Sequence, residues 1–331
     1  MARKMIGVDL GGTFIKAGVV DHEGRVLSRV KRPTDTAEGR NTIIRNIAAA
    51  VVEARERAGV GWRQISAVGL GAPGLFEQPA GIVSQSPNLP VLAGKLLAPP
   101  VMKAAGHPEI PIVLENDANV AAFAEAWIGC ARGVRTMVLM TLGTGIGGGI
   151  VLNGEIWRGS RGTAGELGHQ NLFPNGVRCG CGNRGCLEAY ASAPALVRRF
   201  KEAVRGSKPT RLTAQLKRGE PVTAAEISDA AVKGDPLCLA LMEETGRFLG
   251  IGVMNLLHIL NIELVAFTGG MTAAGDLLLD SIRNEARQRT LLLAMKGVKI
   301  AFSRMGNDAG LIGAAGWALR RTHGLRLGGR T

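Results

Sequence analysis

The chain has 331 residues, of which 46% are hydrophobic and 20% are charged. These values are typical of globular proteins and exclude disorder, and at about 150 residues per domain the length predicts two domains. Forty Lys and Arg against 27 Asp and Glu give a net charge of +13. The basic residues are dispersed outside the tail Arg320–Arg330, and one Tyr with eight Phe offers few rings for stacking on bases. The charge therefore does not predict a nucleic-acid partner.

The N-terminal segment follows the pattern strand, glycine turn, strand. Apolar residues over Met5–Leu10 and Phe14–Val20 flank the turn Gly11–Thr13, and Arg25–Val30 is expected to add a third strand. The other elements predicted in this half are a helix over 41–58 and strands over 65–71 and 110–114.

The same pattern returns roughly 130 residues later. Thr136–Leu142 predicts a strand, Gly143–Gly148 a glycine turn and Gly149–Leu152 a second strand. The duplication predicts an α/β protein of two related domains that face one another, with the phosphates of a ligand between the two turns. The elements expected after this copy are helices over 193–205, 223–233, 237–260, 276–288 and 309–321, and strands over 264–267 and 298–302.

Asp9 stands at the end of the first strand, before the Gly-Gly turn. Backbone N–H groups in such a turn can cradle phosphate oxygens, the Asp9 carboxylate could hold a hydrated Mg²⁺, and Lys16 could add a positive charge for phosphate. An ordinary hairpin with a surface lysine explains the same residues, so this segment alone does not decide between the two.

Gly143–Gly148 matches the G-x-G-x-x-G pattern of dinucleotide-binding turns. That fold needs a helix directly after the glycines, whereas here a hairpin follows through Asn153-Gly154. The segment therefore favours a second phosphate loop over a dinucleotide-dependent oxidoreductase. No Walker A sequence occurs in the chain.

Glu115-Asn116-Asp117 follows a predicted strand and precedes an alanine-rich helix expected over 118–131. An Asn or Asp at this place is a common helix N-cap. The same carboxylate at a strand end could also act as a general base toward a hydroxyl group. Both interpretations can hold together, and the cap is the simpler one.

Three cysteines and a histidine form the sharpest signal in the chain. Cys179, Cys181 and Cys186 lie within eight residues, and His169 precedes them by ten. One His and three Cys make a closed tetrahedral ligand set that suits a structural Zn²⁺. Cys130 and Cys238 lie apart, in predicted helices, and are expected to be core residues.

No targeting segment or membrane span is expected. Met1–Lys4 leads directly into the first strand rather than into a signal sequence. The most apolar stretch, Ile251–Ile262, is too short to cross a bilayer and contains Asn255, His258 and Asn261. We expect a soluble, cytoplasmic protein.

These motifs resemble those of the ROK family of repressors, open reading frames and kinases, within the actin-like ATPase superfamily, and the glucokinase branch is the most similar. Asp9–Thr13 and Gly143–Gly148 are similar to the phosphate loops and Gly269-Gly270 to the adenosine loop, while Glu166–His169 and Cys179–Glu188 are similar to the family signature. The resemblance spans Ile6 to about Leu319. It implies two ribonuclease-H-like (actin-like ATPase) domains with an interdomain cleft: a small α/β domain over 1–115, rejoined by the final helix at about 309–331, and a larger α/β domain over 116–308 that carries the zinc loop.

The resemblance also implies a role for each matching residue, with Asp117 as the catalytic base. The residues implied to bind sugar hydroxyls are Gly74, Asn88, Asn116, Asp117, Glu166, His169 and Glu188. Those implied to bind ATP and Mg²⁺ are Asp9, Gly11, Gly12, Thr13, Thr144, Gly145, Gly269 and Gly270, and Lys16 joins them from its place in the hairpin. His169, Cys179, Cys181 and Cys186 would hold the structural Zn²⁺, which would order the loop bearing His169 and Glu188.

The implied activity is transfer of the ATP γ-phosphoryl group to the 6-hydroxyl of a hexose, glucose first, by a homodimer formed through the larger domain. The family often has a Trp a few residues after Pro-Asn-Leu, and Pro90–Leu92 has none, so the hexose stays open. N-acetylmannosamine, N-acetylglucosamine, fructose and allose are alternative acceptors, and polyphosphate is an alternative donor. A sugar-responsive transcriptional regulator is a further alternative. Such members carry an added helix-turn-helix, and with a first strand at Met5 we expect none here.

Overall fold

The computed structural model describes all residues except 1–2, 78–80, 87–88, 207, 326 and 328–331. The chain divides into two compact units. Unit 1 comprises Met1–Met137, Gly149–Gly165 and Arg304–Thr331, and unit 2 comprises Val138–Gly148 and Glu166–Ser303.

Unit 1 contains a five-stranded sheet in the order β3-β2-β1-β4-β8. Its strands are β1 (Lys4–Leu10), β2 (Phe14–Asp21), β3 (Val30–Pro33), β4 (Ile65–Ala72) and β8 (Ile112–Asn116). The first three strands pair antiparallel, whereas β4 pairs parallel with both β1 and β8. The β1–β2 turn is tight because the Gly11 N–H donates to Phe14 O at 2.9 Å. The carboxyl ends of β1, β4 and β8 consequently meet at one edge of the sheet.

A second five-stranded sheet has the order β11-β10-β9-β12-β13. Its strands are β9 (Thr136–Leu142), β10 (Ile146–Leu152), β11 (Glu155–Ile156), β12 (Leu264–Thr268) and β13 (Lys299–Phe302). β10 and β11 pair antiparallel, and β12 and β13 pair parallel. Numbered within each sheet, both orders read 3-2-1-4-5. This shared topology confirms the α/β fold class and the predicted duplication.

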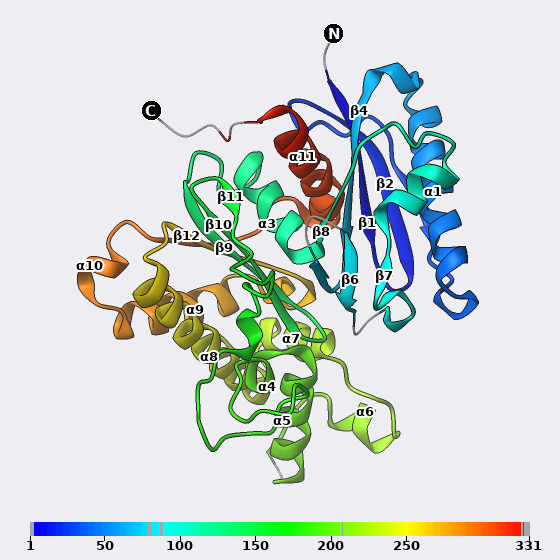
Figure 1. Cartoon of the computed structure of the whole chain (residues 1–331). Helices are drawn as coiled ribbons and strands as arrows, with labels where there is room; N and C mark the ends of the chain where they lie inside the picture. The colour runs from blue at the N-terminus through cyan, green and yellow to red at the C-terminus, as the bar shows by residue number, and fades with distance from the viewer. Residues whose placement is uncertain (1–2, 78–80, 87–88, 207, 326, 328–331) are drawn as a thin grey trace. The chain divides into compact units, whose positions relative to one another are not determined.

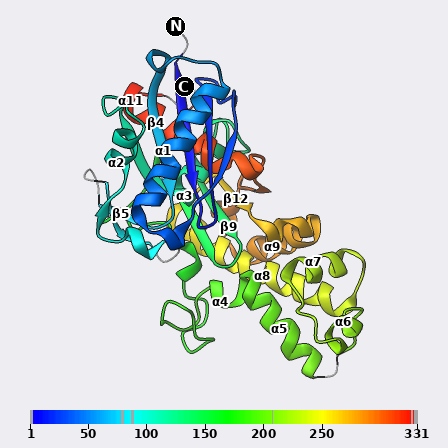
Figure 2. The ribbon, with the colours of Figure 1, turned by 90° about the vertical axis from the view of Figure 1, so that its right-hand side faces the viewer.

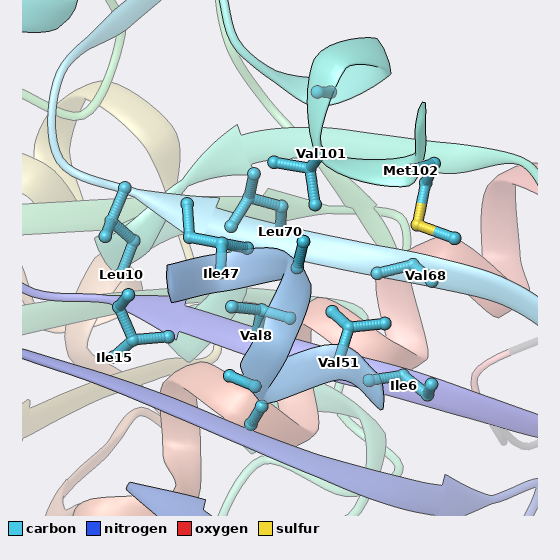
Figure 3. Close-up of a cluster of buried hydrophobic side chains, with 14 of the residues drawn as sticks. Ile6, Val8, Leu10, Ile15, Ile47, Val51, Val68, Leu70, Val101 and Met102 are labelled. Carbon is cyan, nitrogen blue, oxygen red and sulfur yellow. The ribbon is translucent and has the colours of Figure 1, made fainter. Parts of the chain in front are cut away.

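One face of the first sheet is covered by α1 (Arg40–Arg57) and α2 (Ala98–Ala104). Helical spacing brings Ile47 and Val51 of α1 down onto Val8 of β1, and Val101 of α2 packs into the same cluster (Figure 3). All of these side chains are excluded from solvent. Burial of each is worth roughly 1.5–3 kcal/mol, so this cluster provides the rigid support of the sheet edge.

The opposite face is covered by α11 (Ala309–His323), and α3 (Asp117–Trp127) packs against α11 (Figures 1 and 2). Glycine allows the close approach, since a Cβ on Gly313 would lie 1.7 Å from Val120 O. Phe123 of α3 and Trp317 of α11 meet edge to face, 5.2 Å between ring centroids. Because α3 packs against α11, residues 116–137 belong to unit 1. The sequence predicted a domain boundary between residues 115 and 116.

Unit 2 is mainly helical. Its helices are α4 (Glu188–Ala191), α5 (Ala193–Arg205), α6 (Thr213–Lys217), α7 (Ala224–Val232), α8 (Pro236–Leu260), α9 (Asp276–Arg289) and α10 (Leu292–Met295). Gly246 and Gly250 of α8 allow α9 to pack closely, because a Cβ on Gly246 would lie 2.4 Å from Ser281 Cβ. Within the described residues, no helix combines the length and apolarity that a membrane crossing needs.

Two local expectations were wrong, and one small sheet was not predicted. The strand expected over 25–30 begins only at Val30, because the Ser28 hydroxyl donates to Ala54 O at 2.7 Å and accepts from the Val19 N–H at 3.1 Å. α3 ends at Trp127, so Cys130 lies in the turn after it, half-buried, where its N–H donates to Glu125 Oε2 at 2.8 Å. The three-stranded sheet of β5 (Leu75–Glu77), β6 (Ile82–Gln85) and β7 (Lys95–Leu96) carries no clear sequence pattern and was not predicted.

Asp235 caps α8 from a fully buried position. Its Oδ1 accepts from the Cys238 N–H at 2.9 Å, and its Oδ2 accepts from the Arg211 N–H at 2.6 Å and the Thr210 hydroxyl at 2.9 Å. Burial acts to raise the Asp235 pKa, but these hydrogen bonds outweigh it and hold the pKa below its ordinary value. The cap therefore stabilises the fold in its ionised form.

We expect Asp235→Asn to lower the free energy of unfolding at pH 7 by about 1–3 kcal/mol, because the amide cannot accept from the donors at Oδ2. The folded pKa lies below the unfolded value of about 3.9, so the stabilisation is complete above that pH and is lost as the pH falls through the folded value. Urea unfolding at pH 7 and pH 3 checks this. A difference in the free energy of unfolding between wild type and variant that is the same at both pH values would contradict it.

Candidate active site

Asp117 is the first residue of α3 and follows the end of β8. Asn116 is the N-cap, since its Oδ1 accepts from the Asn119 N–H at 3.1 Å. Its Nδ2 donates to Gly74 O at 3.1 Å, which joins two of the expected sugar-binding residues. The Asp117 Oδ1 accepts from the Ala118 N–H at 2.9 Å and the side chain is half-buried. Asn116 therefore takes the capping role.

The strand register places a second carboxylate at the same sheet edge. Asp9 pairs with Gly71 across β1–β4, and Gly71 pairs with Glu115 across β4–β8. In parallel α/β sheets the carboxyl ends of the strands are the usual place for ligands. The same edge of the sheet therefore holds Asp9, Glu115 and Asn116, as their positions at predicted strand ends suggested.

Lys16 faces Asp9 across the β1–β2 hairpin, with its Nζ 3.6 Å from Asp9 Oδ2. Burial raises the pKa of the Asp9 carboxyl, although Lys16 opposes the shift. The start of α11 is also close, since a Cβ on Gly310 would lie 2.6 Å from Asp9 Cγ. A carboxylate that burial disfavours in its charged form is one that a divalent cation would stabilise, so Asp9 fits a Mg²⁺ ligand.

In unit 2 the second glycine turn is held by Glu188. The Ile146 N–H donates to Glu188 Oε2 at 2.9 Å, and a Cβ on Gly145 would lie 2.5 Å from the same oxygen. The Gly147 N–H donates to the Thr141 hydroxyl at 3.2 Å. Gly269, at φ +105°, packs on this turn, because a Cβ there would lie 2.2 Å from Leu142 O. The expected phosphate loop and adenosine loop of unit 2 are therefore in contact.

A pocket of about 520 Å³ lies beside Thr144 of this turn. The Ala193 N–H, at the start of α5, donates to Gly143 O at 2.9 Å, so the helix N-terminus meets the glycine turn. The pocket has an apolar wall formed by Ala193, Pro194, Val197 and Ala224. Its charged side is formed by Arg198, Lys201, Arg205 and Glu202, and Glu202 pairs with Arg198 at 3.1 Å. An apolar wall with cations and a helix N-terminus suits a flat ring that carries phosphates.

The four expected metal ligands come together in unit 2. The ligand atoms of His169, Cys179, Cys181 and Cys186 lie within 4.8 Å of one another. Cys181 Sγ and Cys186 Sγ are 3.7 Å apart, and Cys179 Sγ is 3.8 Å from His169 Nδ1. Ligands about 2.3 Å from a tetrahedral Zn²⁺ stand roughly 3.8 Å apart, so the residues fit a closed zinc site.

The loop around this cluster depends on glycine. Gly185, at φ +78°, lies against Phe173 O, where a Cβ would be 1.7 Å away. Backbone bridges join Asn171 with Cys186 and Arg178 with Arg184. The Cys179 Sγ is also 3.8 Å from Glu188 Oε1. The metal cluster and the second glycine turn therefore share Glu188.

The His169 Nε2, on the ring edge away from Cys179, is 3.9 Å from Glu166 Oε2. Both side chains are partly exposed, so they are accessible to a ligand on the side opposite the cysteines.

The sequence pattern of the ROK family matches residues 5–321. The chain belongs to the ROK family.

Its relatives are similar over nearly their whole length. The glucokinase of Halalkalibacterium halodurans is 35% identical over 320 residues, which is 96% of each chain. The ROK hexokinase of Thermus thermophilus has a TM-score of 0.80 at 36% identity, over 96% of this chain and 98% of that one. The ROK glucokinase of Streptomyces griseus, solved in complex with glucose and AMPPNP, has a TM-score of 0.78 at 36% identity, over 96% and 99%.

Other ROK relatives have different functions. The N-acetylmannosamine kinase of Haemophilus influenzae is 32% identical over 317 residues, which is 95% of each chain. The xylose repressor of Caldicellulosiruptor bescii is 29% identical over 310 residues, which is 93% of this chain and 76% of the repressor. The family alone therefore does not fix an activity.

The expected ROK site residues divide between the units. Unit 1 contains Gly74, Asn116, Asp117 and the Asp9–Lys16 hairpin. Unit 2 contains the other expected residues, which are Thr144, Gly145, Glu166, His169, Cys179, Cys181, Cys186, Glu188, Gly269 and Gly270. Asn88 lies outside the described residues. Sequence reasoning missed Arg158, which pairs with Glu115 at the Asp117 end of β8. No motif marks Arg158, since its partner lies 43 residues away and only the fold joins them.

Proposed function

We propose that this ROK protein is a sugar kinase that transfers the γ-phosphoryl group of ATP to the 6-hydroxyl of a hexose, with glucose as the expected acceptor. The observation that carries the proposal is the place of Asp117, directly after the N-cap Asn116 at the end of a sheet edge that also holds Asp9. Full-length similarity to glucokinases at 35–36% identity, one of them solved with glucose and AMPPNP, supports the substrate class.

In the proposed reaction the sugar O6 attacks the γ-phosphorus in line, the new O6–P bond forms and the bond to the β-γ bridging oxygen breaks. Asp117 takes the proton that O6 loses, and ADP leaves with the electron pair of the broken bond. The transition state of phosphoryl transfer is loose, so catalysis depends mainly on position and charge. Asn116, tied to Gly74 and Asn119, would hold a sugar hydroxyl beside the base.

The nucleotide would be bound by the remaining groups. We assign phosphate contacts to Gly11, Gly12, Thr13, Lys16, Thr144 and Gly145, and adenosine contacts to Gly269, Gly270 and the pocket beside Thr144. Asp9 would hold Mg²⁺, which when bound neutralises charge on the phosphate oxygens. The cytoplasm, where ATP is available, remains the expected location.

Zn²⁺ would be structural, because His169 and the three cysteines leave no open coordination position. When bound, the metal would fix the loop that carries His169 and Glu188. Glu166, His169 and Glu188 would then meet sugar hydroxyls in a defined geometry, which is the usual role of a supporting metal near a site.

The test is release of ADP from Mg-ATP over a panel of free hexoses and amino sugars. Glucose should give the highest kcat/KM. No release with any sugar, either from ATP or from polyphosphate as donor, would overturn the kinase assignment.

A kinase for another sugar is the second candidate. The 32% identity to an N-acetylmannosamine kinase and the lack of a Trp after Pro87–Leu89 favour it, and differences of about 1–3 kcal/mol in the pocket suffice to change the preferred hexose. The same panel decides between the two. The regulator alternative would require DNA binding, which a band-shift titration at low salt tests.

We also propose a homodimer formed through unit 2. Leu292 and Leu293 of α10 are 86% and 85% exposed, and Leu291 and Ile259 beside them are also exposed. The Leu291 N–H donates to His258 Nε2 at 3.0 Å, which joins α10 to the end of α8. Exposed apolar groups of this kind commonly mark an interface.

We expect Leu292→Glu combined with Leu293→Glu to convert a dimer into a monomer, because burying two carboxylates opposes association. Light scattering after gel filtration measures the mass, with Val232→Glu, an exposed apolar residue of α7, as the control. A variant that stays dimeric would place the interface elsewhere.

A further inference from the structure

Glu115 is a buried carboxylate directly before the proposed base. It is 3% exposed, and a charged group at such a site requires partners for both oxygens. Its Oε1 accepts from the Asn116 N–H at 3.0 Å and from Asn119 Nδ2 at 3.0 Å. One oxygen thus holds the cap residue and the first turn of α3, the two places between which Asp117 lies.

Arg158 supplies the partner for the other oxygen. Its Nε donates to Glu115 Oε2 at 2.5 Å, and its Nη2 forms an ion pair with the same oxygen. Arg158 follows β11 and belongs to unit 1, as does Glu115. Removing this cation would leave the Glu115 charge buried without compensation, which proteins tolerate poorly.

Arg158 is itself held by an aromatic ring. Its guanidinium lies 5.0 Å from the ring centroid of Trp317, which is 1% exposed in α11. Trp317 packs edge to face on Phe123 of α3. Arginine suits this place because its planar group can stack on a ring and donate from two nitrogens at once, which lysine cannot do.

We infer that the Arg158–Glu115 ion pair is a positioning pair that fixes the start of α3 and thereby aims Asp117 at the sugar hydroxyl. The inference rests on the proposed function. Neither residue needs to touch substrate, because Glu115 acts through Asn116 and Asn119, and Arg158 acts through Glu115. The expected consequence is an effect on kcat, since a base displaced by about 1 Å can cost up to ~100-fold in rate.

The experiment compares Arg158→Met, Arg158→Lys, Glu115→Gln and the Arg158→Met/Glu115→Gln double variant in steady-state kinetics. We expect Arg158→Met to lower kcat by about 10- to 100-fold while the KM for Mg-ATP changes by less than about twofold. Arg158→Lys should recover part of the loss because it keeps the charge. The double variant should lose less than the product of the two single losses, because the unpaired charge is gone.

The matched control is Arg32→Met, which breaks another ion pair of unit 1, the one between Arg32 Nη1 and Glu53 Oε2 at 2.7 Å. It should leave kcat unchanged. Wild-type kcat in Arg158→Met, or losses that multiply in the double variant, would overturn the inference. If Arg158→Met does not fold, Arg158→Lys and Glu115→Gln carry the test. Inactive wild-type protein, or a fully active Asp117→Ala, would instead overturn the proposed function.

Discussion

Replacement of Asp117 by Ala should lower kcat for sugar phosphorylation by about 10²–10⁴-fold, the usual cost of losing one positioned general base. The protein should remain folded, because Asn116 and not Asp117 accepts the capping hydrogen bond from the Asn119 N–H. The helix loses one carboxylate in its first turn, worth about 0.3–1 kcal/mol, together with the hydrogen bond that this carboxylate accepts from the Ala118 N–H. The measurement is ADP release at saturating sugar and ATP, with thermal unfolding recorded on the same sample.

Asn119→Ala is a useful comparison, because it changes the same helix turn and leaves the carboxylate. It removes the Nδ2 donor to Glu115 but keeps the backbone N–H that Asn116 caps, so it should cost less in kcat than Asp117→Ala. A fully active Asp117→Ala would refute the assignment of the base. A variant that only unfolds would show that Asp117 is a structural residue of α3.

The sequence predicts the parts of this molecule that depend on local patterns. The two strand-turn-strand segments, the helix at Arg40–Arg57 and the helix at Ala193–Arg205 follow from apolar spacing and glycine turns. The proposed base Asp117 and the cysteine cluster were singled out because each lies in a short motif of the sequence. In each case the residues that form the pattern lie within fewer than about twenty positions of one another.

Sequence reasoning did not predict the contacts between residues that are far apart in the chain. Arg158 pairs with the Glu115 carboxylate, 43 residues earlier, and no periodic pattern in the sequence predicts such a pair. Glu188 was expected to bind sugar, but its Oε2 also accepts from the Ile146 N–H of the glycine turn, 42 residues away. The short strands β5, β6 and β7 were missed because strands of two to four residues are too brief to show alternation.

Glu188 contacts both the metal cluster and the glycine turn, and this leads to a prediction about the zinc site. Cys181→Ser should abolish binding of the single zinc expected per chain, because a structural site with three ligands left is no longer closed. The KM for hexose should then rise by about 10- to 100-fold, the scale on which support of a metal site acts on affinity or activity. Since Cys179 lies 3.8 Å from Glu188 Oε1 and Glu188 holds the Ile146 N–H, the KM for Mg-ATP should rise as well.

Metal analysis by mass spectrometry and steady-state kinetics on the purified variant measure both effects. Cys130→Ser is the matched control, since Cys130 is a half-buried thiol in unit 1, apart from the cluster, where burial raises its pKa to about 12. It should keep one zinc and wild-type kinetics. Full zinc content in Cys181→Ser would remove Cys181 from the ligand set. Loss of zinc with both KM values unchanged would show that the metal orders only the loop of its own ligands. Glu188 would then keep its place beside the glycine turn without zinc.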